Sequence, residues 1–173
     1  MSAATPSQIL GMVYADLCAW CAANGGACAL SQNLYDLTEA LRNVPTGWRL
    51  TVHWEGDRAA DERVREGGVV LNSLLLVLDG DLGPTMSPRV GLVQPVAGRP
   101  AFLSLVQRVR ERVMAYRMPW LREPTNGFWY RGCDDKIALP GDLYAAAYNL
   151  RFEVYSQMTI PTERVDLVLP TEA

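Results

Sequence analysis

The chain has 173 residues, of which 16 are Lys or Arg and 19 are Asp or Glu, so its formal net charge is −3 at pH 7. This length suits one domain with a sizeable core, and a composition that is 49% hydrophobic and 20% charged is typical of a globular protein. The acidic balance gives no reason to expect a dedicated nucleic-acid-binding protein, since such domains carry a basic excess. No apolar run is long enough to cross a bilayer, and the N-terminal residues do not have the pattern of a signal peptide. The four cysteines are too few and too irregularly spaced for a disulfide scaffold, so we expect a protein made in a reducing cytoplasm.

The first third of the chain predicts two helices and a strand. Residues 5–8 (Thr-Pro-Ser-Gln) have the pattern of a helix start, and apolar residues then recur at helical spacing up to the Asn-Gly-Gly turn at residues 24–26. A second, shorter helix fits residues 34–44. Residues 48–55 alternate between apolar and polar side chains, which predicts a strand with one wet face, and His53 lies on that polar face.

The middle of the chain contains a charged segment, a strand, a long loop and a helix. Residues 56–68 are charged and lack apolar periodicity, so we expect an exposed loop there. Residues 68–79 are apolar on both faces and predict a buried strand. Residues 79–100 are rich in Gly and Pro and predict a loop long enough to be functional and unnecessary for the fold. Residues 101–116 form an amphipathic helical pattern, and residues 128–131 predict a short strand.

The last strand of the pattern, residues 143–155, is the longest. Thirteen residues at about 3.3 Å each would extend roughly 43 Å, well beyond a usual strand, so we expect it to reach something outside its own subunit. Strict alternation begins at Tyr148 and predicts an outer face that carries Asn149, Arg151 and Glu153, which we interpret as a contact surface. The tail that follows could add an edge strand or hang free.

The order of these elements predicts an α+β fold, with a mainly antiparallel sheet of about four strands and helices packed on one face. We expect a single domain over residues 1–173. It divides into a helical N-terminal part at residues 1–46, a core of sheet and helix at residues 47–160, and a tail at residues 161–173.

The cysteines offer one candidate for chemistry. Cys18 and Cys21 form a CxxC pair, and Cys28 and Cys133 could complete four thiolates around zinc. Both members of the pair lie within a helical pattern, and there is no second close pair, so small core residues are the favoured interpretation. A small zinc-binding or redox domain remains the alternative of another class.

No catalytic, cofactor-binding or metal-binding residues are expected. His53 is the single histidine, so a catalytic triad would have to depend on it, and we expect a surface histidine instead. The carboxylates of Asp79, Asp81, Asp134 and Asp135 are paired, but Asp and Gly at strand ends are ordinary turn chemistry.

Two further groups of residues could form an interface. Trp129 and Tyr130 lie in an aromatic cluster that would either close one end of the core or anchor a partner. The long loop also contains apolar side chains that a free loop would leave in water, so a partner or the core must cover them. These are Met86, Val90, Leu92 and Val93, with Val96 beside them.

The second half of the chain resembles the tail-terminator and tail-completion proteins of long-tailed bacteriophages. The resemblance lies in an apolar strand at residues 69–78, a loop, the helix at residues 103–116 with the run LVQRVRERV, and the closing strand AYNLRFEVYSQM. The run WRLTVHWEG in the first half is similar but less specific. The resemblance implies a structural subunit without enzymatic activity or cofactor.

Such a subunit forms a ring, typically a hexamer, at the head-proximal end of the tail tube. There it ends polymerisation of the tube and offers a surface to the head connector. The implied partners are further copies of the chain, the tail tube protein and the connector or neck proteins. DNA would pass through the lumen without specific binding, and the implied location is the virion, with no membrane contact. A head-completion or connector-stopper subunit is the alternative within the same class.

Overall fold

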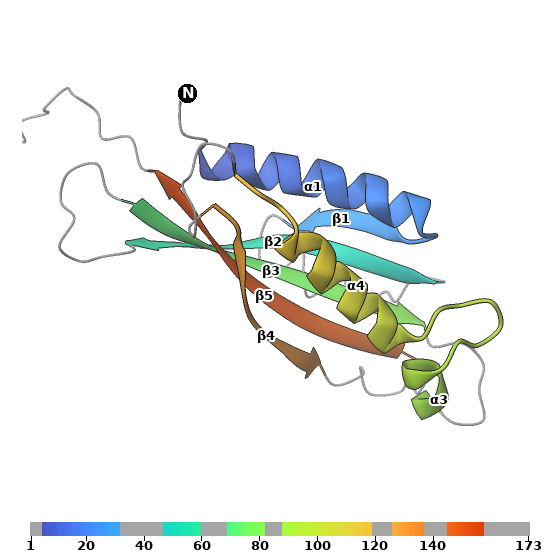
Figure 1. Ribbon diagram of the computed structural model, residues 1–173. Helices are drawn as coiled ribbons and strands as arrows, with labels where there is room; N and C mark the ends of the chain where they lie inside the picture. Colours follow the sequence, from blue (N-terminus) through green and yellow to red (C-terminus); the bar gives the residue numbers. More distant parts are fainter. Residues whose placement is uncertain are drawn as a thin grey trace, which may run out of the picture.

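The computed structural model describes residues 5–31, 47–59, 69–81, 88–118, 126–136 and 145–157. Two layers make up this part of the chain, a sheet and a pair of helices that cover one of its faces (Figure 1). The helices are α1 (Pro6–Ala23), α3 (Pro88–Val93) and α4 (Phe102–Met114). The strands are β1 (Ala27–Ser31), β2 (Trp48–Ala59), β3 (Val69–Asp81), β4 (Phe128–Lys136) and β5 (Ala145–Gln157). None of the described helices is long and apolar enough to cross a membrane.

The five strands lie in the order β1-β2-β3-β5-β4. β1 pairs with β2 in parallel, and every other pair is antiparallel. The predicted α+β class with a mainly antiparallel sheet is therefore confirmed. The sheet has one strand more than the four expected, because β1 lies within the part of the chain that was predicted to be helical. Its five residues, Ala-Cys-Ala-Leu-Ser, have no clear alternation, and only pairing with β2 makes them a strand.

Two strands continue through a glycine where the sequence pattern predicted an end. β2 runs on to Ala59 through a register shift between Trp54 and Gly56, so the start of the predicted charged loop is strand. β4 extends to Lys136 through a similar shift between Tyr130 and Gly132. The predicted helix at residues 34–44 and the tail at residues 161–173 lie outside the described residues.

The two long helices bury one stripe each against the sheet. α1 begins at a capping box between Thr5 and Gln8, as the sequence predicted. Its buried residues follow at spacings of three or four, and those of α4 do the same. They are Ile9, Val13, Leu17 and Cys21 on α1, and Phe102, Leu105, Val109 and Val113 on α4.

The core lies between these stripes and the inner face of the sheet. Leu50, Leu76, Leu150 and Phe152 come from the three central strands, and all are fully buried. Burial of such a side chain contributes roughly 1.5–3 kcal/mol. The alternation that predicted β5 therefore assigned its inward-facing residues correctly.

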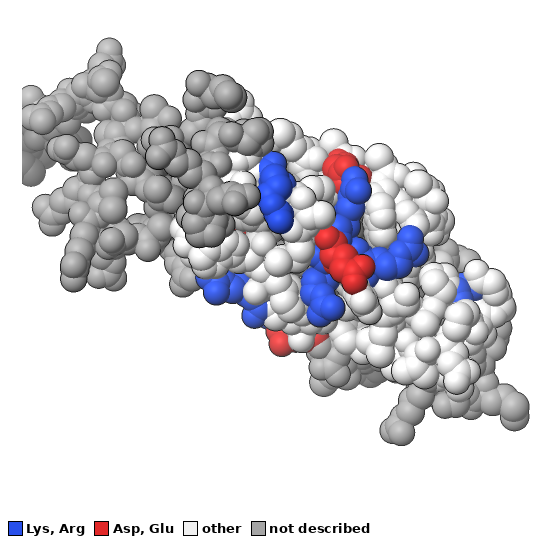
Figure 2. Space-filling model, in the orientation of Figure 1, with Lys and Arg blue, Asp and Glu red and all other residues white. Residues whose placement is uncertain are grey.

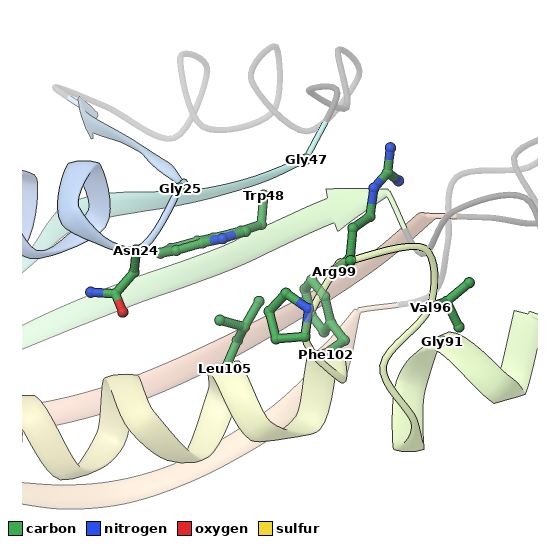
Figure 3. Close-up of a pocket in the computed structure, with 11 residues that line it drawn as sticks. Asn24, Gly25, Gly47, Trp48, Gly91, Val96, Arg99, Phe102 and Leu105 are labelled. Atoms are coloured by element: carbon green, nitrogen blue, oxygen red, sulfur yellow. The ribbon is translucent and has the colours of Figure 1, made fainter.

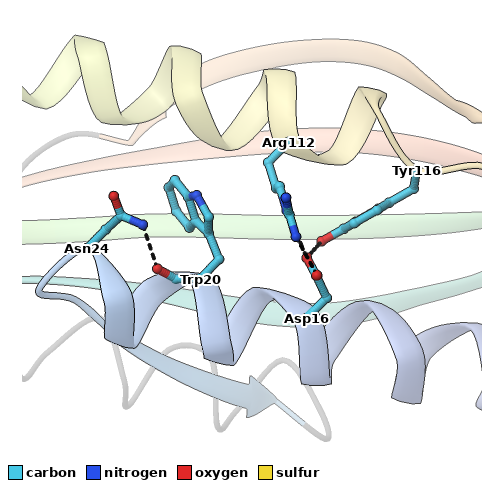
Figure 4. A network of polar contacts seen from close by, with 5 residues as sticks. All are labelled: Asp16, Trp20, Asn24, Arg112 and Tyr116. Atoms are coloured by element: carbon cyan, nitrogen blue, oxygen red, sulfur yellow. Dashed lines mark hydrogen bonds and ion pairs between the residues drawn. The ribbon is translucent and has the colours of Figure 1, made fainter.

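A row of polar contacts joins α1 to α4, which run antiparallel over the sheet (Figures 1 and 4). Arg112 donates hydrogen bonds to both carboxylate oxygens of Asp16. One turn away along α4, Arg108 donates to the side-chain oxygen of Asn24 and lies over the ring of Trp20, 5.4 Å from its centroid. Arg108 and Arg112 are four residues apart on α4, and Asp16, Trp20 and the C-cap Asn24 follow one another at intervals of four along α1, so these contacts lie in one row.

Candidate protein–protein interface

Three large apolar side chains are exposed where α3 meets the start of α4. Val90 is 37% exposed, Val93 is 62% exposed and Leu103 is 41% exposed, and α3 contacts α4 directly. We call these three residues the α3–α4 corner. A group of exposed apolar side chains is unfavourable in water and is typical of a surface that contacts another protein.

A tight turn connects α3 to α4 and fixes the position of the corner. Val96 and Arg99 exchange two backbone hydrogen bonds of 3.0 and 2.9 Å. Between them, Ala97 and Gly98 have φ values of 49° and 79°, the conformation of a two-residue turn with both central residues left-handed. The prediction that residues 79–100 form one long loop is therefore wrong for its described part, which consists of the end of β3, a helix and this turn.

A small pocket lies beside the turn, between the end of α1 and the start of α4 (Figure 3). It encloses about 170 Å³. Its apolar lining comes from Trp48, Phe102 and Leu105, with Asn24 and Arg99 among its other residues. Sites for small molecules usually measure about 300–1,000 Å³. The volume and lining therefore suit one apolar side chain of a partner better than a cofactor.

Glycine on the α1–β1 turn allows Trp48 to form a wall of this pocket. A Cβ atom at Gly26 would lie 2.4 Å from atoms of the Trp48 ring, which is closer than real contacts allow. The ring also packs against Trp20, with 5.7 Å between the centroids. Trp48 is only 7% exposed as a result, although it begins a strand at the end of the sheet.

Sequence patterns did not reveal the pocket, because three distant segments contribute to it. Trp48 was assigned to a strand, and Phe102 and Leu105 to the buried face of a helix; both assignments are correct and say nothing of a cavity. The one available signal was the concentration of glycines around these residues. Gly25, Gly47, Gly91 and Gly98 all line the pocket.

The predicted loop residues separate into different environments. Val90 and Val93 have the exposure that an interface requires. Leu92 is half-buried and packs against the main core, so it supports the fold. Met86 lies outside the described residues.

Trp129 and Tyr130 lie on opposite faces of the sheet. Tyr130 packs toward the core, with its ring centroid 5.5 Å from that of Phe152. Trp129 packs edge-on against Tyr155 at 5.5 Å, and the guanidinium of Arg131 lies over its ring. Both rings are half-buried and engaged within the subunit.

The outer face of β5 is not the free surface that the alternation suggested. Asn149 is 2% exposed and Glu153 is 8% exposed, so the prediction of an exposed strand face is wrong at both positions. β5 is an interior strand, paired with β3 on one side and with β4 on the other. Arg131 forms an ion pair with Glu153. Arg151 is partly exposed and binds Asp134 within the same subunit.

Arginine side chains gather over α4 and toward α1 (Figure 2). Four arginines are exposed along the helix and the turn after it, with two acidic residues near them. The arginines are Arg108, Arg110, Arg112 and Arg117, and the acidic residues are Glu111 and Asp16. Although the whole chain is acidic, basic side chains therefore outnumber acidic ones on the described surface over α4.

The four cysteines do not form one cluster. Cys28 lies on β1 and Cys133 on β4, the two opposite edges of the sheet. Four inter-strand steps of about 4.8 Å put these edges about 19 Å apart, whereas thiolates around zinc lie about 2.3 Å from the ion. The proposed four-thiolate site is therefore excluded. In the described part of the chain, no group of three or more His, Cys, Asp or Glu side chains is arranged to hold a metal ion.

The other two cysteines, Cys18 and Cys21, lie on α1, and Cys28 lies on β1 directly after the turn that ends this helix. The pKa of Cys28 is raised, first by the hydrogen bond with Cys21 and then by burial. Burial is the main cause that raises the pKa of Cys18. Cys18 and Cys28 are therefore expected to be neutral thiols near pH 7.

Two further titratable residues are also buried, one on the predicted wet face of β2 and one near the end of β3. His53 is 5% exposed, so the expectation of a surface histidine is wrong. Asp79 is 2% exposed and forms an ion pair with Arg49, with 2.5 Å between Nη2 and Oδ2. Burial raises the pKa of Asp79, and its hydrogen bond with Arg49 opposes this shift only in part.

No protein-family model matches the chain, and no curated protein sequence matches it.

Proposed function

We propose that this protein is a structural virion protein, a tail-terminator or neck subunit. In this proposal it forms a ring at the head-proximal end of the tail tube, ends polymerisation of the tube and joins the tail to the head. The resemblance of the second half of the chain suggests this class. The observation that carries the proposal is the α3–α4 corner, where Val90, Val93 and Leu103 are exposed beside a pocket.

The α3–α4 corner and the pocket beside it have the features of a site at which one protein anchors another. Binding energy at interfaces concentrates where one side chain fills a desolvated pocket that near-neutral contacts surround. Here the pocket would accept the anchor, and the three exposed side chains would exclude water around it. A ring of identical subunits needs such a site, because each head-to-tail contact joins two different surfaces of the same chain.

The edges of the sheet offer a second means of contact. β1 pairs with β2 only from Arg49 to His53. From Trp54 to Ala59, the outer side of β2 has no neighbouring strand among the described residues, and Figure 1 shows β2, β3 and β5 extending past the end of β1. Unpaired strand edges can bind an extended segment of a neighbouring chain through backbone hydrogen bonds.

Substitution at the corner tests the proposal. We expect the wild-type protein to form a ring that light scattering and electron microscopy detect, and Val93→Asp to leave a folded monomer. Met12→Asp is the matched control, because Met12 is 47% exposed on α1, away from the corner. Circular dichroism and thermal melting of both variants should match the wild type. Rings that persist in Val93→Asp, or are lost equally in both variants, would exclude the corner as the assembly site.

The position of the protein in the particle tests the wider assignment. Labelled antibody or cryo-electron microscopy of assembled tails should place the chain where the tube meets the head. A position at the distal tip would exclude a terminator. A position within the connector, on heads that carry no tail, would favour the connector-stopper alternative, which shares the small size and the ring.

A further inference from the structure

The pocket beside the α3–α4 corner combines an apolar interior with basic groups at its border. Arg99 is one of the lining residues (Figure 3). Arg108 donates a hydrogen bond to the side-chain oxygen of Asn24, which also lines the pocket, so a second guanidinium lies at this border. The described residues that line the pocket include no Asp or Glu. The ligand that suits such a site is an apolar side chain with carboxylates close to it.

Residues 161–173 of the chain itself have this chemistry. The segment reads Pro-Thr-Glu-Arg-Val-Asp-Leu-Val-Leu-Pro-Thr-Glu-Ala and lies outside the described residues. Its three acidic residues outnumber its single arginine. In an extended peptide of this sequence, Val165, Leu167 and Leu169 would project from one side at intervals of about 6.6 Å, with Asp166 between the first two.

We propose that the pocket and the α3–α4 corner bind residues 161–173 of a second copy of the chain. Leu167 is the anchor in the pocket, and the carboxylates of the segment lie beside Arg99 and Arg108. The apolar side chains on either side of the anchor cover the exposed residues of the corner. The inference rests on the proposed function, because it names the partner that this same site holds in the ring.

The pocket lies at the end of the sheet opposite to the point where segment 161–173 would leave it. A Cβ atom at Gly80 would lie 2.7 Å from the carbonyl oxygen of Gly47 and 3.0 Å from the ring of Phe102, and both of these residues line the pocket. Gly80 pairs with Ala146 at the start of β5. The described chain ends at Gln157, at the other end of the same strand.

This distance favours the segment of a neighbouring copy. The eleven residue steps of β5 from Ala146 to Gln157 cover about 36 Å at 3.3 Å each. The ten steps from Gln157 to Leu167 span at most about 33–36 Å when fully extended. A subunit could therefore fill its own pocket only with a perfectly straight segment along the whole sheet. A neighbour in a head-to-tail ring has no such restriction, and the contact then joins two different surfaces of the same chain.

A fluorescein-labelled peptide of residues 161–173 tests the contact directly. The receptor is the full-length Leu167→Asp variant, whose own segment lacks the anchor. Fluorescence anisotropy should show one binding site per chain, with an affinity that falls as salt is added. A peptide with Leu167→Asp should bind at least about ten-fold more weakly, because a charge cannot replace the anchor. A peptide with Thr171→Ala is the matched control and should bind as the unchanged peptide does.

Charge reversal assigns the site on the receptor. Arg99→Glu together with Arg108→Glu, added to the same receptor, should weaken binding about ten-fold or more. A peptide whose three acidic residues are changed to Lys should recover much of this loss. Arg117→Glu, beyond the other end of α4, is the matched control and should leave the affinity unchanged. Circular dichroism establishes that each receptor is folded, and the peptide variants give a test that does not depend on receptor folding.

Assembly of the full-length chain separates this inference from the proposed function. Leu167→Asp should be monomeric under conditions in which the wild type forms rings. Mixed with a chain that carries Arg99→Glu and Arg108→Glu, it should form pairs and no rings, because each chain then keeps only one of the two surfaces.

The possible failures are distinct. A peptide that does not bind, or rings that persist in Leu167→Asp, would overturn the segment as occupant and leave the ring in place. A wild type that stays monomeric although the peptide binds would show that the segment fills its own pocket, which overturns the assignment to a second copy. Open chains of subunits that are joined through the segment and never close into a ring would instead overturn the proposed function and support the inference.

Discussion

Arg112 of α4 donates hydrogen bonds to both carboxylate oxygens of Asp16 on α1. Its Nε lies 2.9 Å from one oxygen and its Nη2 lies 2.5 Å from the other. The Tyr116 hydroxyl donates to the same carboxylate from just beyond the C-terminal end of α4. The hydrogen bond from Arg112 is the main cause that lowers the pKa of Asp16. Burial is the main cause that raises the pKa of Tyr116, and the adjacent Asp16 raises it further. One carboxylate thus holds the two helices in register.

Asp16→Asn should reduce the free energy of unfolding at pH 7 by about 0.5–1 kcal/mol, since both side chains of the pair are partly exposed and solvent screens their interaction. Urea unfolding measures this difference. Asp57→Asn, at an exposed position on β2, is the matched control and should change stability by less than about 0.5 kcal/mol.

The effect of Asp16→Asn should depend on pH. The pKa of Asp16 is lower in the folded chain than in the unfolded chain, so its contribution is complete above the unfolded value of about 3.9 and is lost as pH falls through the folded value. Wild type and variant should therefore converge in stability as pH falls below the folded pKa of Asp16. A difference in stability that persists at such low pH would show that the variant's side-chain amide is destabilising because of its packing and not because a charge is lost.

Ala97 tests the turn between α3 and α4. Its φ of 49° is unfavourable for a side chain with a Cβ atom, by about 1–2 kcal/mol relative to glycine. Ala97→Asn suits this type of turn and should leave stability unchanged or raise it by up to about 1 kcal/mol. Ala97→Val should lower stability, because β-branched residues avoid this conformation. Thermal melting distinguishes the two, and equal effects would contradict the left-handed geometry.

Sequence patterns predicted the fold where they repeat over many residues. α1, α4, β3 and β5 each bury a long stripe or alternating face, and periodicity indicates such elements well. β1 and α3 are only five and six residues long, and contacts with β2 and α4 form them, which no local pattern encodes.

The candidate site was predicted only in part. Val90 and Val93 were expected to be covered by a partner or by the core, and the subunit leaves both exposed. Burial of Asn149 and Glu153 was not predicted, because alternation indicates which face of a strand a residue occupies and not whether that face is covered. The pocket depends on the positions of distant segments in space, and one sequence does not give these.

The buried pair Arg49 and Asp79 provides a test of charge inside the sheet. Arg49→Leu leaves the Asp79 carboxylate buried without its partner, so it should cost about 3–5 kcal/mol at pH 7, whereas the double change of both residues to Leu should recover most of that loss. Urea unfolding of the single and double variants completes the cycle. Arg151→Leu is the control, since its ion pairs are exposed, and it should cost less than about 1 kcal/mol.

The pH dependence of Arg49→Leu follows from the direction of the Asp79 shift. Burial already raises this pKa in the folded chain, and loss of Arg49 should raise it further. The folded variant then binds a proton more readily than the unfolded chain. Its loss in free energy of unfolding, relative to the wild type, should therefore shrink as pH falls from 7 through the folded pKa toward about 4. A deficit that is constant over this range would mean that lost packing, and not the unpaired charge, destabilises the variant.

Gly26 tests the packing that forms the wall of the pocket. A methyl group there would lie 2.4 Å from the Trp48 ring, so Gly26→Ala must displace either the indole or the α1–β1 turn and should cost about 1–3 kcal/mol. Tryptophan fluorescence should shift to longer wavelength as Trp48 becomes more exposed.

Gly11→Ala is the matched control for Gly26→Ala. No atom lies within 4 Å of a Cβ at Gly11, which is exposed in the interior of α1, so this change should stabilise the protein by about 0.5–1 kcal/mol and leave the fluorescence unchanged. If the pocket serves assembly, Gly26→Ala should also weaken the ring at protein concentrations where the variant is still folded, while Gly11→Ala keeps it. Rings of unchanged stability in a folded Gly26→Ala variant would confine the contact to the exposed side chains of the α3–α4 corner and leave the pocket without a part in it.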